Sequence, residues 1–159
     1  MMRVLSVILL LCGLLAATPR AAADEAVDAA SGTVRLLIAA EPPSLDSVRA
    51  TDQLSFFVLA HLMDGLLQYD ADNRLAPALA ERWELRPDGA TFWLRRGATW
   101  EDGAPVTAHD FVYAWREVLR PANAAPYASL LYPLRNARAI ASGELPVESL
   151  GVDAPGDYR

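Results

Sequence analysis

The side chains that could perform chemistry are few, and their spacing does not form a catalytic or metal-binding pattern. The chain contains two histidines, His61 and His109, which are too far apart in sequence to predict a metal site by themselves. The sequence contains no nucleophile elbow, no phosphate-binding glycine loop and no paired metal-ligand motif. We expect His61 to be a partly buried, hydrogen-bonded core residue and His109 to be solvated. The sequence thus predicts neither an enzyme nor a bound metal or cofactor.

One carboxylate and four tryptophans could still suggest a site. Asp102 could act as a catalytic carboxylate, but it precedes a glycine, and an Asp-Gly pair is typical of a tight turn. Tryptophan rings could stack on sugars or bases. Trp83 and Trp115 instead fall at positions that are expected to face a core, while Trp93 and Trp100 stay open to either interpretation. Structural roles are therefore the favoured interpretation for these residues.

The first residues of the chain resemble a secretory signal of the Sec type. Arg3 precedes an apolar run at 4–17, and small residues at 21–23 provide a cleavage site before Asp24. The apolar run is shorter than the roughly 20 residues that a membrane-spanning helix needs. We therefore expect cleavage after Ala23 and a periplasmic mature protein.

A cysteine near the end of this apolar run raises the alternative of lipid attachment. Such a site requires a small residue before the cysteine, and Leu11 precedes Cys12. The favoured interpretation is that Cys12 belongs to the signal, which leaves a mature chain without cysteine and hence without disulfides or thiolate metal sites. All basic residues are arginines, and the formal net charge is −6. Acidity of this kind argues against nucleic acid or anionic membrane as a partner.

The segment before residue 70 predicts one strand and one helix. Residues 24–32 are small and polar and are expected to be a flexible leader. The β-branched and apolar run at 33–39 predicts the first strand, and a loop follows to about Asp52. Residues 54–67 have the length and composition of a largely buried helix.

The clearest local pattern is a β-hairpin. Alternating residues at 83–86 and 91–95 flank Pro87-Asp88-Gly89, which suits a tight turn. The alternation predicts one buried face, made by Trp83, Leu85, Phe92 and Leu94.

Two helices are expected after the hairpin. Thr107 and Asp110 can cap the first, which Pro121 ends. Its core-facing stripe has helical spacing and comprises Phe111, Ala114, Trp115, Val118 and Leu119. The second is expected over 125–142, bent near Pro133 and ended by Gly143.

The order of these elements resembles a known family. Residues 75–121 read LAPALAERWELRPDGATFWLRRGATWEDGAPVTAHDFVYAWREVLRP. This segment, with its Trp-Glu pair, DG hairpin, Trp-x-Asp-Gly-x-Pro and Thr-Ala-x-Asp motifs, resembles family 5 of the bacterial extracellular solute-binding proteins. Ser44-Leu45-Asp46 also fits the start of that family. Residues 123–129 and 150–152 are similar to its oligopeptide-binding branch.

The resemblance implies an α/β, periplasmic-binding-protein-like bilobal fold of class II type, of which only the N-terminal part is expected here. Residues 33–52 would be the first strand and ligand-proximal loop of the first lobe, and 53–159 the start of the solute-binding domain. The turn-like ending at 156–159 is interpreted as the middle of a longer protein. The full-length receptor is expected to be monomeric, to capture short peptides and to deliver them to an ABC permease in the inner membrane.

The resemblance also implies ligand-binding residues. In the oligopeptide branch, the loop after the Ser-Leu-Asp motif contributes backbone contacts to the peptide, and here that loop holds Thr51, Asp52 and Gln53. Tyr127 matches a tyrosine that lines the cleft in that branch, although packing in the core is the alternative for it. The acidic residue that holds the peptide α-amino group is expected after Arg159.

Three alternatives to a peptide receptor remain open from the sequence. A receptor of the same fold could bind a nickel chelate, heme or a glycan, because fold does not fix function. A secreted hydrolase would need a nucleophile or metal set beyond Arg159. The chain could also be a truncated product without a function of its own.

Overall fold

The computed structural model describes residues 27–159, so the predicted signal peptide lies outside the described residues. The chain divides into two compact units, Met1–Ala39 and Ala40–Arg159, and each is described by itself. A helix of the length and apolarity needed to cross a membrane is not found among residues 27–159.

The described part of the first unit is a small antiparallel ladder. Strand β1 (Val27–Asp28) pairs with β2 (Thr33–Val34), and the carboxylate of Asp28 accepts hydrogen bonds from the turn between them. The strand predicted over 33–39 is therefore wrong beyond Val34. The length of β2 is limited by that of β1, because a strand extends only as far as a neighbouring strand can pair with it. Leu37, which follows, is fully exposed.

The second unit begins with helix α2 (Gln53–Leu62), which is shorter and more exposed than predicted. Met63 adopts an extended conformation, and the following apolar residues enter strand β3 (Leu67–Tyr69), which pairs with β4 (Leu75–Pro77). Ser55 and Leu59 are the buried residues of α2, so the prediction of a largely buried helix is wrong.

His61 of this helix also departs from the prediction of a core residue, because its side chain is exposed. Its hydrogen bond is confirmed, since the ring Nδ1 lies 2.7 Å from the carbonyl oxygen of Phe57. The ring also contacts that of Phe57, which is exposed as well. His61 therefore lies on the exposed side of α2 and not in the core.

The predicted hairpin is confirmed as β5 (Ala80–Arg86) and β6 (Gly89–Leu94). Trp83 lies opposite Phe92, and Leu94 is buried. Leu85 was predicted to share this buried face but is 71% exposed. It pairs with Ala90 next to the turn, at the end of the hairpin that does not reach the core.

Helix α3 (Ala108–Leu119) is confirmed with both of its predicted ends. The backbone N–H and the hydroxyl of Thr107 donate to the carboxylate of Asp110, at 2.7 and 3.1 Å. The helix ends at Leu119, and its C-terminal cap, Arg120, directly precedes Pro121.

The helix predicted over 125–142 is wrong as one element. Within this range the chain instead forms one 3₁₀ helix, η2 (Ala128–Leu131), and one short helix, α4 (Ala137–Ala141). Two further 3₁₀ helices lie outside it, η1 (Pro121–Asn123) before and η3 (Val147–Ser149) after. Asn136 has a positive φ of 69°, which no α-helix accommodates, so the predicted bend is a full interruption. Gly143, with φ of 83°, follows α4 as expected.

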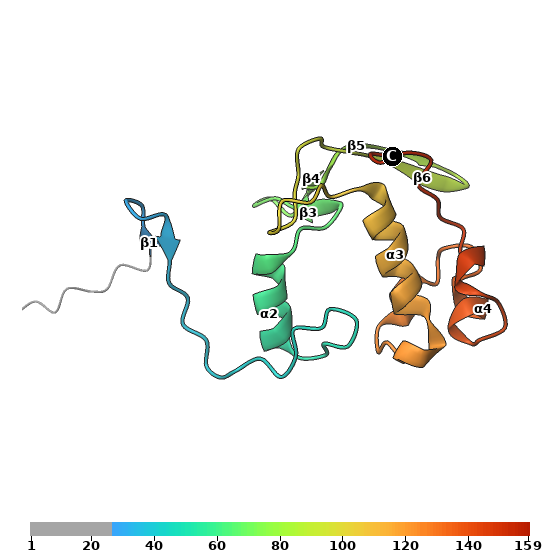
Figure 1. Ribbon diagram of the computed structural model, residues 1–159, viewed down its shortest axis with the longest axis horizontal. Helices are drawn as coiled ribbons and strands as arrows, with labels where there is room; N and C mark the ends of the chain where they lie inside the picture. Colours follow the sequence, from blue (N-terminus) through green and yellow to red (C-terminus); the bar gives the residue numbers. More distant parts are fainter. Residues whose placement is uncertain (1–26) are drawn as a thin grey trace, which may run out of the picture. The chain divides into compact units, whose positions relative to one another are not determined.

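The core of the second unit consists of two clusters joined by α3. The first contains Leu119 and residues of α4 and the segment after it: Ala137, Ile140, Val147 and Leu150. The second contains Ala108 with Ala80 and Leu94 of the hairpin. Figure 1 shows α3 running from the hairpin toward α4. The predicted mixture of helices and strands is confirmed.

Candidate functional site

The Ser-Leu-Asp motif folds the loop that leads into α2. The hydroxyl of Ser44 accepts a hydrogen bond from the N–H of Asp46, whose carboxylate accepts one from Val48. The N–H of Ser44 donates to the hydroxyl of Ser55, a completely buried residue of α2. These bonds attach the loop to the helix and place the predicted ligand residues 51–53 at the helix start.

Asp52 is the N-terminal cap of α2. Its carboxylate accepts a hydrogen bond of 2.8 Å from the N–H of Ser55, which is one of the unpaired donors of the first helical turn. The pKa of Asp52 is held below its usual range by hydrogen bonds with Ser55. The bond with the Ser55 side chain has the largest effect, and the bond with the Ser55 backbone follows. Thr51 and Gln53 on either side are exposed. The side chain of Asp52 thus already has a structural partner.

Tyr127 lies close to this helix. Its ring centroid is 5.7 Å from that of Phe56, with an interplanar angle of 56°. Tyr127 is 43% exposed and directly precedes η2. Tyr127 is therefore not part of the core that residues 27–159 form.

A cavity of about 500 Å³ lies at this contact. Phe56 and Tyr127 both line it, and Phe56 is one helical turn beyond Asp52. Residues 51–53 are not part of the lining. The other lining residues are Ser47, Val48, Trp115, Val118, Ala125, Leu130 and Leu131.

Apart from Tyr127, the sequence did not predict the lining residues as site residues, and two of those missed are aromatic. Trp115 was expected in the core; it packs against the first cluster and also lines the cavity. Phe56 has no special position in the sequence pattern. The single signal that could have found it is its spacing of four residues from Asp52, which places both on one side of α2.

The cavity lining carries no charged side chain. The lining residues with a polar group on the side chain are Ser47, Tyr127 and Trp115. Across residues 27–159, no group of three or more His, Cys, Asp or Glu side chains is placed to hold a metal ion. The arrangement suits the binding of an uncharged group by contact and a few hydrogen bonds.

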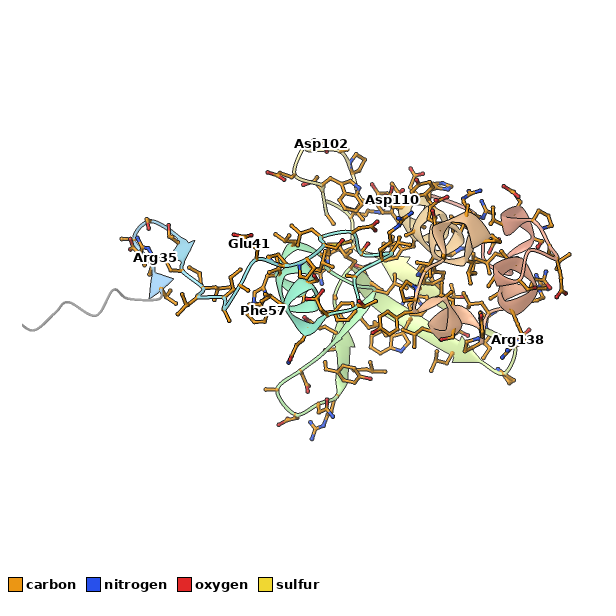
Figure 2. All side chains as sticks on the ribbon, turned by 90° about the horizontal axis from the view of Figure 1, so that it is seen from below. Arg35, Glu41, Phe57, Asp102, Asp110 and Arg138 are labelled. Carbon is orange, nitrogen blue, oxygen red and sulfur yellow. The ribbon has the colours of Figure 1, made fainter. Side chains whose placement is uncertain are left out.

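The remaining candidates have structural partners. The carboxylate of Asp102 accepts a hydrogen bond from the N–H of Ala104 at the tip of the loop between β6 and α3, as the turn interpretation predicted (Figure 2). The guanidinium of Arg82 covers the ring of Trp93 at 3.5 Å, so this face is not free for a ligand. His109 is exposed, as predicted, with its Nε2 3.6 Å from a carboxylate oxygen of Asp157.

Comparisons with known proteins agree on one family. The chain is 45% identical to the periplasmic oligopeptide-binding protein OppA of Haemophilus influenzae over 123 residues, which are 75% of this chain and 23% of that protein. It is 38% identical over 121 residues to the probable deoxycholate-binding periplasmic protein YgiS of Escherichia coli, covering 74% of this chain and 23% of the relative. The chain thus spans about a quarter of the length of these curated relatives.

A solved structure shows the same relationship. The crystal structure of Haemophilus influenzae OppA in complex with RPPGFSPFR superposes with a TM-score of 0.71 at 45% identity, covering 75% of this chain and 24% of that one. Residues 74–159, more than half of the chain, match the family described as bacterial extracellular solute-binding proteins, family 5 Middle. The chain therefore belongs to family 5 of the bacterial extracellular solute-binding proteins.

Proposed function

We propose that this chain is part of the substrate-binding component of a peptide ABC importer. The observation that carries the proposal is the 45% identity to an oligopeptide-binding protein whose structure contains a bound peptide. The uncharged cavity at Tyr127 and Phe56 supports it, because a concave site with few polar groups suits binding without a chemical step.

The proposed mechanism is capture between two lobes that close about a hinge. The backbone of Thr51, Asp52 and Gln53 and the side chain of Tyr127 contact the peptide. Because the Asp52 carboxylate caps α2, a backbone contact from this loop does not compete with the fold. Main-chain hydrogen bonds then provide most of the affinity, as in strand addition. The receptor is not an enzyme, and ATP is hydrolysed by other subunits.

The proposed location is the periplasm. A Sec signal that is cleaved after Ala23 exports the protein, and a monomeric full-length receptor delivers its peptide to the cognate permease in the inner membrane. The periplasmic relative from Haemophilus influenzae supports this location.

Calorimetry on the full-length receptor tests the proposal. Di- to pentapeptides of mixed sequence are expected to bind, with deoxycholate, a nickel chelate, heme and a glycan as competing solutes. Deoxycholate is included because one relative is named for it. Binding of one of these solutes in the absence of any peptide binding contradicts the peptide assignment.

A further inference from the structure

We propose that Ser55 is a positioning residue for peptide capture, because its hydroxyl ties both ends of the loop 44–52 to α2. The inference rests on the proposed peptide-binding function, in which the backbone at the end of this loop contacts the peptide. Ser55 is completely buried and does not itself meet the ligand, so its effect on affinity passes through the loop.

The Ser55 hydroxyl bonds to the two ends of the loop. Its oxygen accepts a hydrogen bond of 3.3 Å from the N–H of Ser44, eleven residues earlier in the chain. The Ser55 side chain also bonds the carboxylate of Asp52, which accepts a second bond, of 2.8 Å, from the Ser55 N–H. Since a hydroxyl has one donor and can accept as well, the group is satisfied in both directions at a buried position.

The loop between these ends has little else to hold it in place. Among residues 44–53, only Ala50 is buried. Asp46 accepts hydrogen bonds from later N–H groups of the same loop, through its carbonyl and its carboxylate. Such local bonds set the shape of the loop but do not attach it to the helix. The loop leaves and returns beside the start of α2, where the bonds of Ser55 fix its position (Figure 1).

A loop that is ordered before binding strengthens binding. It loses little conformational entropy when a ligand arrives, whereas a loop that still has to be ordered loses more. Without the Ser55 hydroxyl, the N–H of Ser44 loses its partner on α2 and the start of the loop is released. We therefore expect Ser55 to raise the affinity for peptide without contacting it.

Ser55→Ala removes these side-chain bonds with little change in packing. The substitution deletes one heavy atom, and alanine is a good helix former. Ser55→Cys is the second variant, used if Ser55→Ala does not fold, because its thiol fills the site but is only a weak donor and acceptor.

Val147→Ala provides a control that loses stability by another route. Val147 is buried in the first core cluster and belongs to η3, outside both the loop and α2. A change in affinity that merely follows a loss of stability would appear in this variant as well.

The experiment combines hydrogen exchange, read by mass spectrometry, with calorimetry on the full-length receptor. In Ser55→Ala, residues 44–52 are expected to exchange about fivefold faster than in the wild type, the scale of one hydrogen bond. The Kd for Ala-Ala-Ala is expected to rise by about the same factor, with a less favourable binding entropy. Val147→Ala is expected to keep the wild-type exchange of residues 44–52 and the wild-type Kd.

Three results overturn the positioning role without touching the proposed function. They are equal exchange of residues 44–52 in the wild type and Ser55→Ala, an unchanged Kd in Ser55→Ala, and an equal rise of the Kd in Ser55→Ala and Val147→Ala. Failure of the wild type to bind Ala-Ala-Ala or any other short peptide overturns the proposed function itself, and the two failures are thereby distinguished.

Discussion

The aromatic rings of Phe56 and Tyr127 lie 5.7 Å apart, centroid to centroid, and are tilted by 56°. Tilted rings at this separation attract each other. Phe56 belongs to α2, whereas Tyr127 follows α3 and directly precedes η2. The contact therefore joins the two regions of the chain for which ligand binding is proposed.

Replacing Tyr127 with alanine is expected to weaken peptide binding more than it weakens the fold. Because the side chain is 43% exposed, the loss of unfolding free energy should be about 1 kcal/mol, the scale of one aromatic pair. The Kd for a tripeptide should rise about tenfold, as expected for an aromatic contact of about 1.4 kcal/mol. Thermal melting and calorimetry on the same full-length variant measure both quantities.

Tyr113→Ala is the matched control for this substitution. Tyr113 lies on α3, is more exposed and does not line the cavity, so its Kd should equal that of the wild type. A loss of about 3–5 kcal/mol for Tyr127→Ala with an unchanged Kd would instead identify Tyr127 as a core residue.

The Asp52 carboxylate should make the stability of α2 fall as the pH is lowered, and substituting Asp52 with a residue that does not titrate should remove this dependence. Its pKa is lowered in the folded chain, so its contribution is present above the unfolded pKa of about 4 and is lost as the pH falls through the folded value. Asn also caps helices but does not titrate. The difference in melting temperature between wild type and Asp52→Asn should therefore change as the pH is lowered from 7 to 3.

Asp52→Ala is the companion variant. It removes the acceptor of the Ser55 N–H and should melt below the wild type at neutral pH. If the melting difference between wild type and Asp52→Asn is the same at every pH, the carboxylate does not stabilise the helix through its charge.

Ile140→Ala tests the first core cluster. Ile140 is completely buried against Leu119, Ala137, Val147 and Leu150, so truncation should cost about 2–5 kcal/mol. Leu85→Ala, at an apolar position that is 71% exposed, should cost less than about 0.5 kcal/mol. Chemical unfolding of the two variants measures the contrast, and comparable losses would mean that Leu85 is covered in the full-length protein.

The elements with strong local signals could be predicted from the sequence. The turn around Asp88 specifies the β5–β6 hairpin by itself, because its residues favour a tight turn regardless of what packs on the strands. Thr107, Asp110 and Pro121 delimit α3 in the same way, through bonds and restrictions within a few residues.

The remainder depends on contacts between distant residues. Two of the missed breaks nevertheless have a local signal, because Asp64-Gly65 directly follows the end of α2 at Met63 and Pro133 lies three residues before the interruption at Asn136. Leu85 is exposed because its end of the hairpin does not reach the core, and the alternation of residues along the strand does not show this. Tyr127 was predicted as a ligand residue through a family resemblance only, and its contact with Phe56 joins parts of the chain that local patterns treat separately.

The mature protein is expected to begin at Asp24. The small residues at 21–23 end an apolar segment that suits a Sec signal. N-terminal sequencing of protein from a periplasmic extract checks the cleavage site. A lipid-modified Cys12 at the N-terminus would place the receptor on a membrane instead.

Residues 24–159, produced alone, are expected to form secondary structure without binding peptide. Large apolar side chains are exposed over much of the second unit, among them Phe57, Leu62 and Leu130, and such surfaces favour self-association. The two small clusters around α3 can keep the hairpin and helix partly formed. Far-ultraviolet circular dichroism should therefore show helix and strand, whereas near-ultraviolet signals should be weak and the melting transition broad. Light scattering should show species larger than a monomer. A sharp cooperative melt of a monomer that also binds a tripeptide would demonstrate that these residues contain a complete domain and a complete binding site.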